Sequence, residues 1–148
     1  MPFVPLHPGL PLNYQVLVFD GDCAFCARCV RFILDRDERN TLFFAARRSA
    51  FGAALEARHP ELTSVSSVLW VTGDDVLGEL VATRWNAVHH MGSYLGGLWE
   101  QLTRCVDFLV PIRLLDAGYA LIAAIRHRLT AGMTCRVPTP DDRRRLLV

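Results

Sequence analysis

The chain has 148 residues, of which 51% are hydrophobic and 21% are charged, and its formal net charge is +1. A chain of this length fits one domain with a sizeable hydrophobic core, which needs no disulfide bonds to hold it together. The apolar share excludes a disordered chain, and the near-zero net charge argues against a protein that binds nucleic acid by electrostatic attraction.

The first residues are rich in proline, with Pro2, Pro5, Pro8 and Pro11 at strict intervals of three. Proline fixes its own φ and lacks a backbone donor, so residues 1–14 are predicted to form an extended arm. Residues 15–148 show no internal repeat and no sign of a second unit, and we expect them to form a single domain.

Short apolar runs at residues 16–19 and 42–45 are typical of buried parallel strands. Two further strands are predicted at residues 67–71 and 76–81, and the short polar connection between them indicates an antiparallel hairpin. Helices are predicted after the first strand, after the second strand and after the hairpin. Extra helices follow towards the C-terminus.

The longer helices are expected to bury one apolar stripe each. The predicted stripes are Phe25, Cys29, Phe32 and Ile33 in the first helix; Val88, Met91, Leu95, Leu98 and Leu102 in the helix after the hairpin; and Ile112, Leu115, Tyr119, Ile122 and Leu129 in the last long helix. The pair Gly96-Gly97 could break or kink the second of these, and Pro111 suits the first turn of the third. A short terminal helix is expected after Thr139.

This order of elements predicts an α/β fold of the thioredoxin-like kind. A strand-helix-strand unit followed by a hairpin gives a four-stranded mixed sheet flanked by helices, here with extra C-terminal helices. Those extra helices could cover the sheet, form a dimer face or rest on a membrane.

The cysteines are the most informative residues. There are five, and three of them (Cys23, Cys26 and Cys29) fall within seven positions where the first strand is predicted to lead into the first helix. Clustered thiols in a reducing compartment are more often catalytic or metal-binding than structural. Because the sequence shows neither a signal peptide nor a run of about 20 uncharged apolar residues, we expect a cytoplasmic protein without a membrane span.

The spacing Cys23-x-x-Cys26 predicts a dithiol–disulfide oxidoreductase that needs no cofactor. A cysteine in the first turn of a helix lies near free backbone N–H groups, which can lower a thiol pKa from about 8.5 to about 3.5–7.5. An exposed Cys23 would then be the nucleophile. Cys26, one turn later and within disulfide reach, would be the resolving thiol.

Asp20 and the three remaining cysteines could also contribute to the site or to the core. Asp20, three residues before Cys23, could accept the proton of Cys26 or could simply form the turn. Cys29 and Cys105 are expected to be core residues. Cys135, in a loop-like segment, could be a second resolving thiol, but a packed side chain is favoured.

Two rival functions remain at this point. Cys23, Cys26 and Cys29 could ligate zinc or an iron–sulfur centre, although a fourth ligand from Cys135, His89 or His90 would have to come from a distance. The chain could also be a thioredoxin-like scaffold without turnover.

The sequence also resembles a known family. Asp20-x-x-Cys23-x-x-Cys26 is similar to the motif of the DCC family of predicted thiol-disulfide oxidoreductases, and residues 135–140 (CRVPTP) resemble the C-terminal segment of that family. The resemblance implies a small bacterial-type protein with a thioredoxin-like fold, with Cys23 and Cys26 as the redox pair and with protein or small-molecule disulfides or thiols as substrates. It also suggests that Asp20 and Cys135 matter.

One departure from thioredoxins concerns the proline that precedes the third strand in those proteins. Here no proline occurs between Pro60 and Pro111, and Val65-Ser66-Ser67 takes that place. A serine hydroxyl at this position could hydrogen-bond the thiolate.

Overall fold

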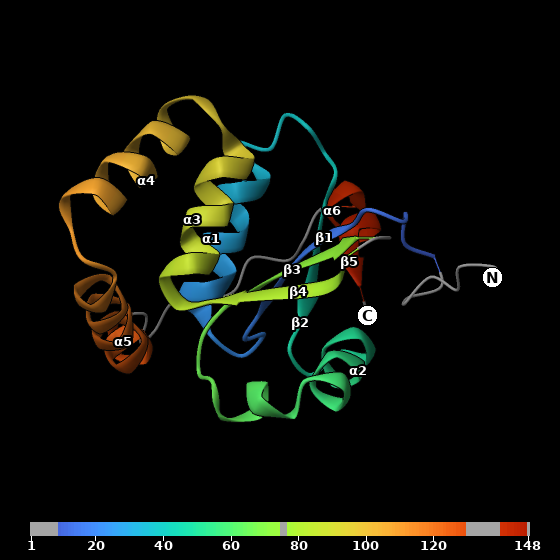
Figure 1. The fold of residues 1–148 in the computed structure, drawn as a ribbon. Coiled ribbons are helices and arrows are strands. Elements are labelled where there is room, and N and C mark those ends of the chain that lie inside the picture. Colours follow the sequence, from blue (N-terminus) through green and yellow to red (C-terminus); the bar gives the residue numbers. More distant parts are fainter. Residues whose placement is uncertain (1–8, 75–76, 130–139, 148) are drawn as a thin grey trace.

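The computed structural model describes residues 9–74, 77–129 and 140–147, which form one mixed sheet with helices on both of its faces (Figure 1). The strands are β1 (Gln15–Phe19), β2 (Leu42–Ala46), β3 (Leu69–Asp74), β4 (Gly78–Thr83) and β5 (Leu146–Leu147), in the spatial order β4-β3-β1-β2-β5. Strand β1 is parallel to β2 and antiparallel to β3, and β3 is antiparallel to β4. The predicted four-stranded thioredoxin-like order is confirmed, and β5 adds an edge strand parallel to β2.

Strand β1 lies at the centre of the sheet and is buried on both sides. Val16 and Val18 face one hydrophobic core, and Leu17 faces the other. Successive side chains of a strand point to opposite faces, so a short apolar run of this kind fits only between two covered faces.

Helices α1 (Ala24–Leu34) and α3 (Arg84–Leu95) cover one face of the sheet (Figure 1). The buried positions of α1 are Cys26, Val30 and Ile33. The predicted stripe was therefore only partly right: Ile33 is buried, but Phe25, Cys29 and Phe32 are not, because the row with Cys26 and Val30 faces the sheet. Phe32 stays partly exposed and packs edge-on against Trp99, with 5.0 Å between the ring centroids.

Helix α2 (Ala50–Arg58) covers the opposite face and buries Phe51 and Leu55. Ser49 caps its N-terminus, since the Ser49 side chain accepts a hydrogen bond from the Gly52 N–H. A short 3₁₀ helix, η1 (Pro60–Ser64), then leads to β3.

Helices α4 (Gly97–Leu109) and α5 (Ile112–Leu129) extend beyond the sheet (Figure 1). The predicted break occurs at Gly96, whose φ of 68° favours glycine. The stripes predicted for this region were partly wrong. Leu98, Leu102, Ile112, Ile122 and Leu129 are exposed. Each helix packs on the domain along one side only, so apolar residues elsewhere on it remain uncovered.

In the described part of the chain, no single helix has both the length and the hydropathy needed to cross a membrane. Residues 97–109 and 112–126 meet these criteria only as a pair, and the chain bends by 117° between them.

The C-terminal residues return to the β2 edge through α6 (Pro140–Arg145) and β5. The Arg145 guanidinium donates to the carboxylate of Asp37, whose side chain is fully buried. Asp37 also accepts a hydrogen bond of 2.8 Å from the Tyr94 hydroxyl. This buried network ties α6 to α3 and to the loop that precedes β2.

Candidate redox site

The turn between β1 and α1 is built around Asp20. The Asp22 N–H donates to Asp20 Oδ1 over 3.1 Å, and the Cys23 N–H donates to the Asp20 carbonyl over 3.2 Å. An aspartate that bonds the backbone two residues later stabilises a tight turn. Asp20 therefore forms the turn, and this turn sets Cys23 at the N-cap of α1.

Cys23 has the predicted place in the helix but not the predicted exposure. Its side chain is completely buried and makes no capping hydrogen bond to the first turn of α1. The expectation of an exposed Cys23 was therefore wrong. Helix α5 packs against α1, the helix that Cys23 caps.

Cys26 lies one turn later and is also buried. Burial and the neighbouring Cys23 thiol raise the pKa of Cys26 to about 12, although Arg126 and the Asp20 backbone act in the opposite direction. Cys23 and Cys26 are thus close together and both present as free thiols, with Cys26 held in its protonated form near neutral pH.

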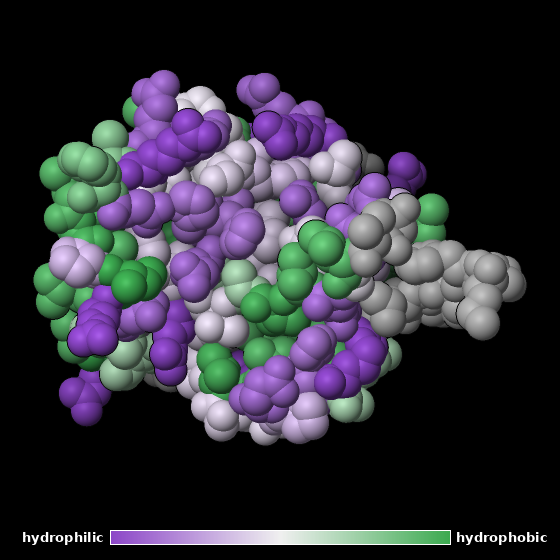
Figure 2. Space-filling view, in the orientation of Figure 1, coloured by the Kyte–Doolittle hydropathy of each residue, from purple (hydrophilic) through white to green (hydrophobic). Residues whose placement is uncertain are grey.

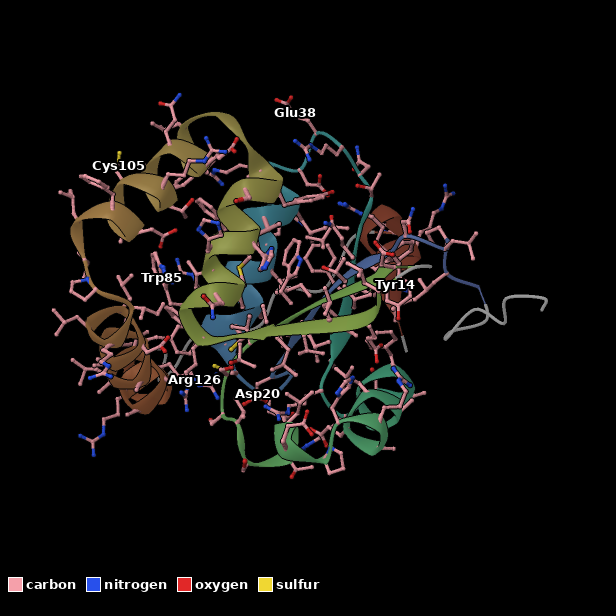
Figure 3. The ribbon with its side chains drawn as sticks, in the orientation of Figure 1. Tyr14, Asp20, Glu38, Trp85, Cys105 and Arg126 are labelled. Carbon is pink, nitrogen blue, oxygen red and sulfur yellow. The ribbon has the colours of Figure 1, made fainter. Side chains whose placement is uncertain are left out.

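A third side chain, from α5, joins this pair. Arg126 is 7% exposed, and one of its NH₂ groups donates to Cys26 Sγ over 3.3 Å while the other reaches Asp20 Oδ2 at 3.3 Å. Figure 3 shows Asp20 and Arg126 next to each other beside the start of α1. Arg126 was not among the site residues predicted from the sequence. The available signal was its position seven residues after Tyr119, on the same side of the helix.

Tyr119 makes the second attachment of α5 to this region. The Val68 N–H, one residue before β3, donates to the Tyr119 hydroxyl over 2.9 Å. Burial, with a smaller contribution from Cys26, raises the pKa of Tyr119. Helix α5 therefore contacts both the thiol pair and the segment that leads into β3.

The expected serine contact to the thiolate is not formed by Ser67. The Ser67 hydroxyl donates to the Val68 carbonyl and accepts a hydrogen bond from the Arg84 N–H. Instead, Arg47, which follows β2, holds this segment by donating to the carbonyls of Leu62 and Val65.

An open depression of about 510 Å³ borders the site on the side of Asp20. Its other lining residues are Arg47, Arg48, Ala53 and Glu56. Arg47 pairs with Glu56 at 2.8 Å, and the exposed Arg48 reaches Asp22 at 2.6 Å. The depression is thus lined by charged groups that already have partners within the domain.

The remaining cysteines lie apart from the pair. Cys29 and Cys105 are exposed, so their predicted place in the core was wrong; Cys105 lies on the outer side of α4 (Figure 3). Cys135 lies outside the described residues. Within the described ranges, no three His, Cys, Asp or Glu side chains converge to hold a metal ion, which leaves the Cys23, Cys26 and Cys29 metal site without geometric support.

The chain is similar to the members of a known protein family. Residues 17–131 match the DCC1-like thiol-disulfide oxidoreductase family. The chain belongs to this family. It is also 27% identical over 135 residues to the uncharacterized protein YuxK of Bacillus subtilis, covering 90% of the present chain and 93% of YuxK. No solved structure matches the chain significantly.

Membership of the DCC1-like family supports a redox role for the chain. The matched region contains Asp20, Cys23, Cys26 and Arg126, so the four groups that meet at the start of α1 all belong to it.

Proposed function

We propose that this protein is a dithiol–disulfide oxidoreductase in which Cys23 is the nucleophile and Cys26 is the resolving thiol. The observation that carries the proposal is the contact between the Arg126 guanidinium and Cys26 Sγ, one helical turn from Cys23 at the N-cap of α1. A fixed positive charge beside a buried thiol is an arrangement that stabilises a thiolate when one forms.

The reaction proceeds by two thiol–disulfide exchanges. The Cys23 thiolate attacks a substrate disulfide, a mixed disulfide forms, and one substrate sulfur leaves as a thiolate that takes up a proton. Cys26 then loses its proton and attacks Cys23 Sγ, which releases the second substrate thiolate. The substrate gains two electrons, the protein holds a Cys23–Cys26 disulfide, and an external dithiol reductant restores both thiols.

The raised pKa of Cys26 suits a resolving thiol. While Cys23 is free, burial and the Cys23 thiol keep Cys26 protonated, so Cys26 does not compete as nucleophile. Once Cys23 is in a mixed disulfide, its contribution to the raised pKa is lost. Arg126 then favours the Cys26 thiolate at the step that requires it.

Asp20 is the acceptor that we propose for the Cys26 proton. Its Oδ2 atom and Cys26 Sγ contact the same guanidinium, which keeps the carboxylate near the thiol. The side chain of Asp20 is 36% exposed, so a proton can pass from it to water.

Exchange at Cys23 requires a movement that exposes its sulfur, because a disulfide cannot approach a buried one. We propose that α5, which contacts Cys26 and Asp20 through Arg126, is the element that moves. The contacts that must open are those of Tyr119 and Arg126. We propose protein or small-molecule disulfides or thiols as substrates, and the cytoplasm, a reducing compartment, as the place of the reaction.

Two variants test the proposal. Cys23→Ser should abolish reduction of a disulfide substrate by the full-length protein, and Cys26→Ser should accumulate a mixed disulfide visible by mass spectrometry. Cys105→Ser, at an exposed position on α4, is the matched control and should keep full activity.

The burial of Cys23 favours one rival, a scaffold that does not turn over. If wild-type protein treated with a graded series of thiol–disulfide buffers never forms the Cys23–Cys26 disulfide, the scaffold is correct and the oxidoreductase is not.

A further inference from the structure

Exposed apolar side chains concentrate on the two helices that extend beyond the sheet. Among the described residues, nine of the thirteen exposed large hydrophobic side chains lie between Leu98 and Leu129. Phe108 and Leu109, the last two residues of α4, are 90% and 74% exposed. The most exposed members, which we call the α4–α5 face, are Leu98, Phe108, Leu109, Leu114, Leu121 and Leu129.

Figure 2 shows hydrophobic surface over α4 and α5, bordered by hydrophilic side chains. Exposed apolar surface gathered in one region marks a contact site more often than scattered single residues do. The α4–α5 face is therefore a candidate contact surface.

The basic side chains of these helices border this face. Arg113 and Arg128 are exposed, and Arg128 lies on the same helical stripe as Leu114 and Leu121. Arg104, on α4, has a side chain that is 71% exposed.

The carboxylates of the same helices form hydrogen bonds or ion pairs within the domain. Asp107 pairs with His89 at 2.5 Å, and Asp116 accepts a hydrogen bond from the Trp85 N–H, so both bind α3. Glu100 is paired with Arg104 at 2.6 Å. Glu100 therefore offsets the charge of Arg104, and the α4–α5 face combines apolar side chains with the positive charges of Arg113 and Arg128.

The opposite side of α5 is attached to the domain through Tyr119 and Arg126. A bilayer could not surround this helix without breaking those polar contacts. In addition, α4 and α5 do not form one straight span, because the chain bends by 117° between them. The geometry therefore fits helices that lie on a membrane surface with one side in contact with lipid.

We propose that the α4–α5 face docks onto the surface of a membrane that contains anionic lipids. Apolar side chains would enter the headgroup boundary while Arg113 and Arg128 attract lipid phosphates. A second copy of the chain is a poorer fit, because it would bring the same arginines against each other. Docking would bring the thiol site close to membrane-associated disulfides, a consequence that, unlike the docking itself, rests on the function proposed above.

The test is flotation of the full-length protein with vesicles of phosphatidylcholine alone or with 30% phosphatidylglycerol, roughly the anionic content that attracts basic segments. We expect binding to the anionic vesicles that weakens with added salt. The double variant Phe108→Asp/Leu109→Asp should lose at least about tenfold in partitioning, and Arg113→Glu/Arg128→Glu should lose a similar factor on anionic vesicles only.

Matched controls separate docking from general effects of charge. Leu77→Asp/Leu80→Asp alters two exposed leucines of the β3–β4 hairpin (69% and 53% exposed). Arg143→Glu/Arg144→Glu reverses two exposed charges on α6. Neither double variant should change partitioning. Cys23→Ser should also bind normally, which keeps this test independent of the redox reaction.

Absence of wild-type binding to anionic vesicles at low salt would overturn the proposal. So would equal binding to both vesicle types, or a dimer in light scattering that the Phe108→Asp/Leu109→Asp variant dissociates. The dimer would show that the face joins two copies of the chain.

Discussion

Arg126 and Asp20 lie 106 positions apart in the sequence and form an ion pair at 3.3 Å beside the buried thiols. The same guanidinium reaches Cys26 Sγ at 3.3 Å, so one side chain from α5 connects the turn after β1 with the second cysteine. The C-terminal helices are therefore part of the site and not an appendage to the sheet.

Replacing Arg126 should slow resolution of the mixed disulfide. In Arg126→Gln the Cys26 thiolate loses a charged hydrogen bond, so the second exchange should slow by about tenfold or more, since such bonds are worth about 1.5–3 kcal/mol. The measurement is the decay of a Cys23 mixed disulfide as a function of pH, whose midpoint should move upward. Arg126→Lys should restore part of the rate, and an unchanged pH midpoint in Arg126→Gln would falsify the proposed role.

Loosening α5 should expose Cys23. Tyr119→Phe removes the hydrogen bond from the Val68 N–H, which should cost about 1–3 kcal/mol because that donor is left without its partner. We expect faster reaction of Cys23 with a thiol reagent, measured by mass spectrometry of the modified peptide. Tyr14→Phe, which loses a comparable bond to Glu79, should not accelerate it. Equal rates in wild type and Tyr119→Phe would contradict a covering role for α5.

Stability at low pH should depend on Glu79. Burial alone would raise the pKa of Glu79, but hydrogen bonds from Arg58, Tyr14 and His59 outweigh it and lower the pKa. A carboxyl whose pKa is lowered by folding stabilises the fold above its unfolded pKa of about 4.3, and that contribution is lost as the pH falls through the folded value.

We therefore expect Glu79→Gln to be less stable than wild type at pH 7, with the difference shrinking below about pH 4. Urea unfolding across this range measures it. Glu61→Gln, at an exposed carboxylate that also approaches His59, is the control and should follow the wild-type curve. A constant difference between Glu79→Gln and wild type at all pH values would rule out this contribution.

The attachment of the C-terminal segment to the domain should depend on the ion pair between Arg145 and Asp37. Arg145→Ala leaves a buried carboxylate without its cation, and removing one partner of a buried pair costs about 3–5 kcal/mol. Arg144→Ala, one residue earlier and exposed, should have little effect. Equal unfolding free energies for the two variants would show that Arg145 does not anchor α6.

Several local features were predictable because neighbouring residues encode them. The apolar run around Val16–Val18 is typical of a buried strand, and the Gly96-Gly97 pair indicated a possible helix break; both features are present in the structure. The place of Cys23 at the start of a helix also followed from the turn residues before it. In contrast, the side of α1 that faces the sheet was predicted correctly only at Ile33. Cys29 and Phe32 are as apolar as Val30, and only contact with the sheet distinguishes them.

By itself, the sequence determined the order of strands and helices, the thioredoxin-like sheet and the pairing of two thiols one turn apart, because hydrophobic periodicity and turn chemistry act over a few residues. Only the tertiary structure decided that Cys23 is covered, that Arg126 reaches Cys26 from 100 positions away, and that the apolar side chains of α4 and α5 face outward. Periodicity shows that a helix has an apolar side, but the packing of distant segments determines what that side meets.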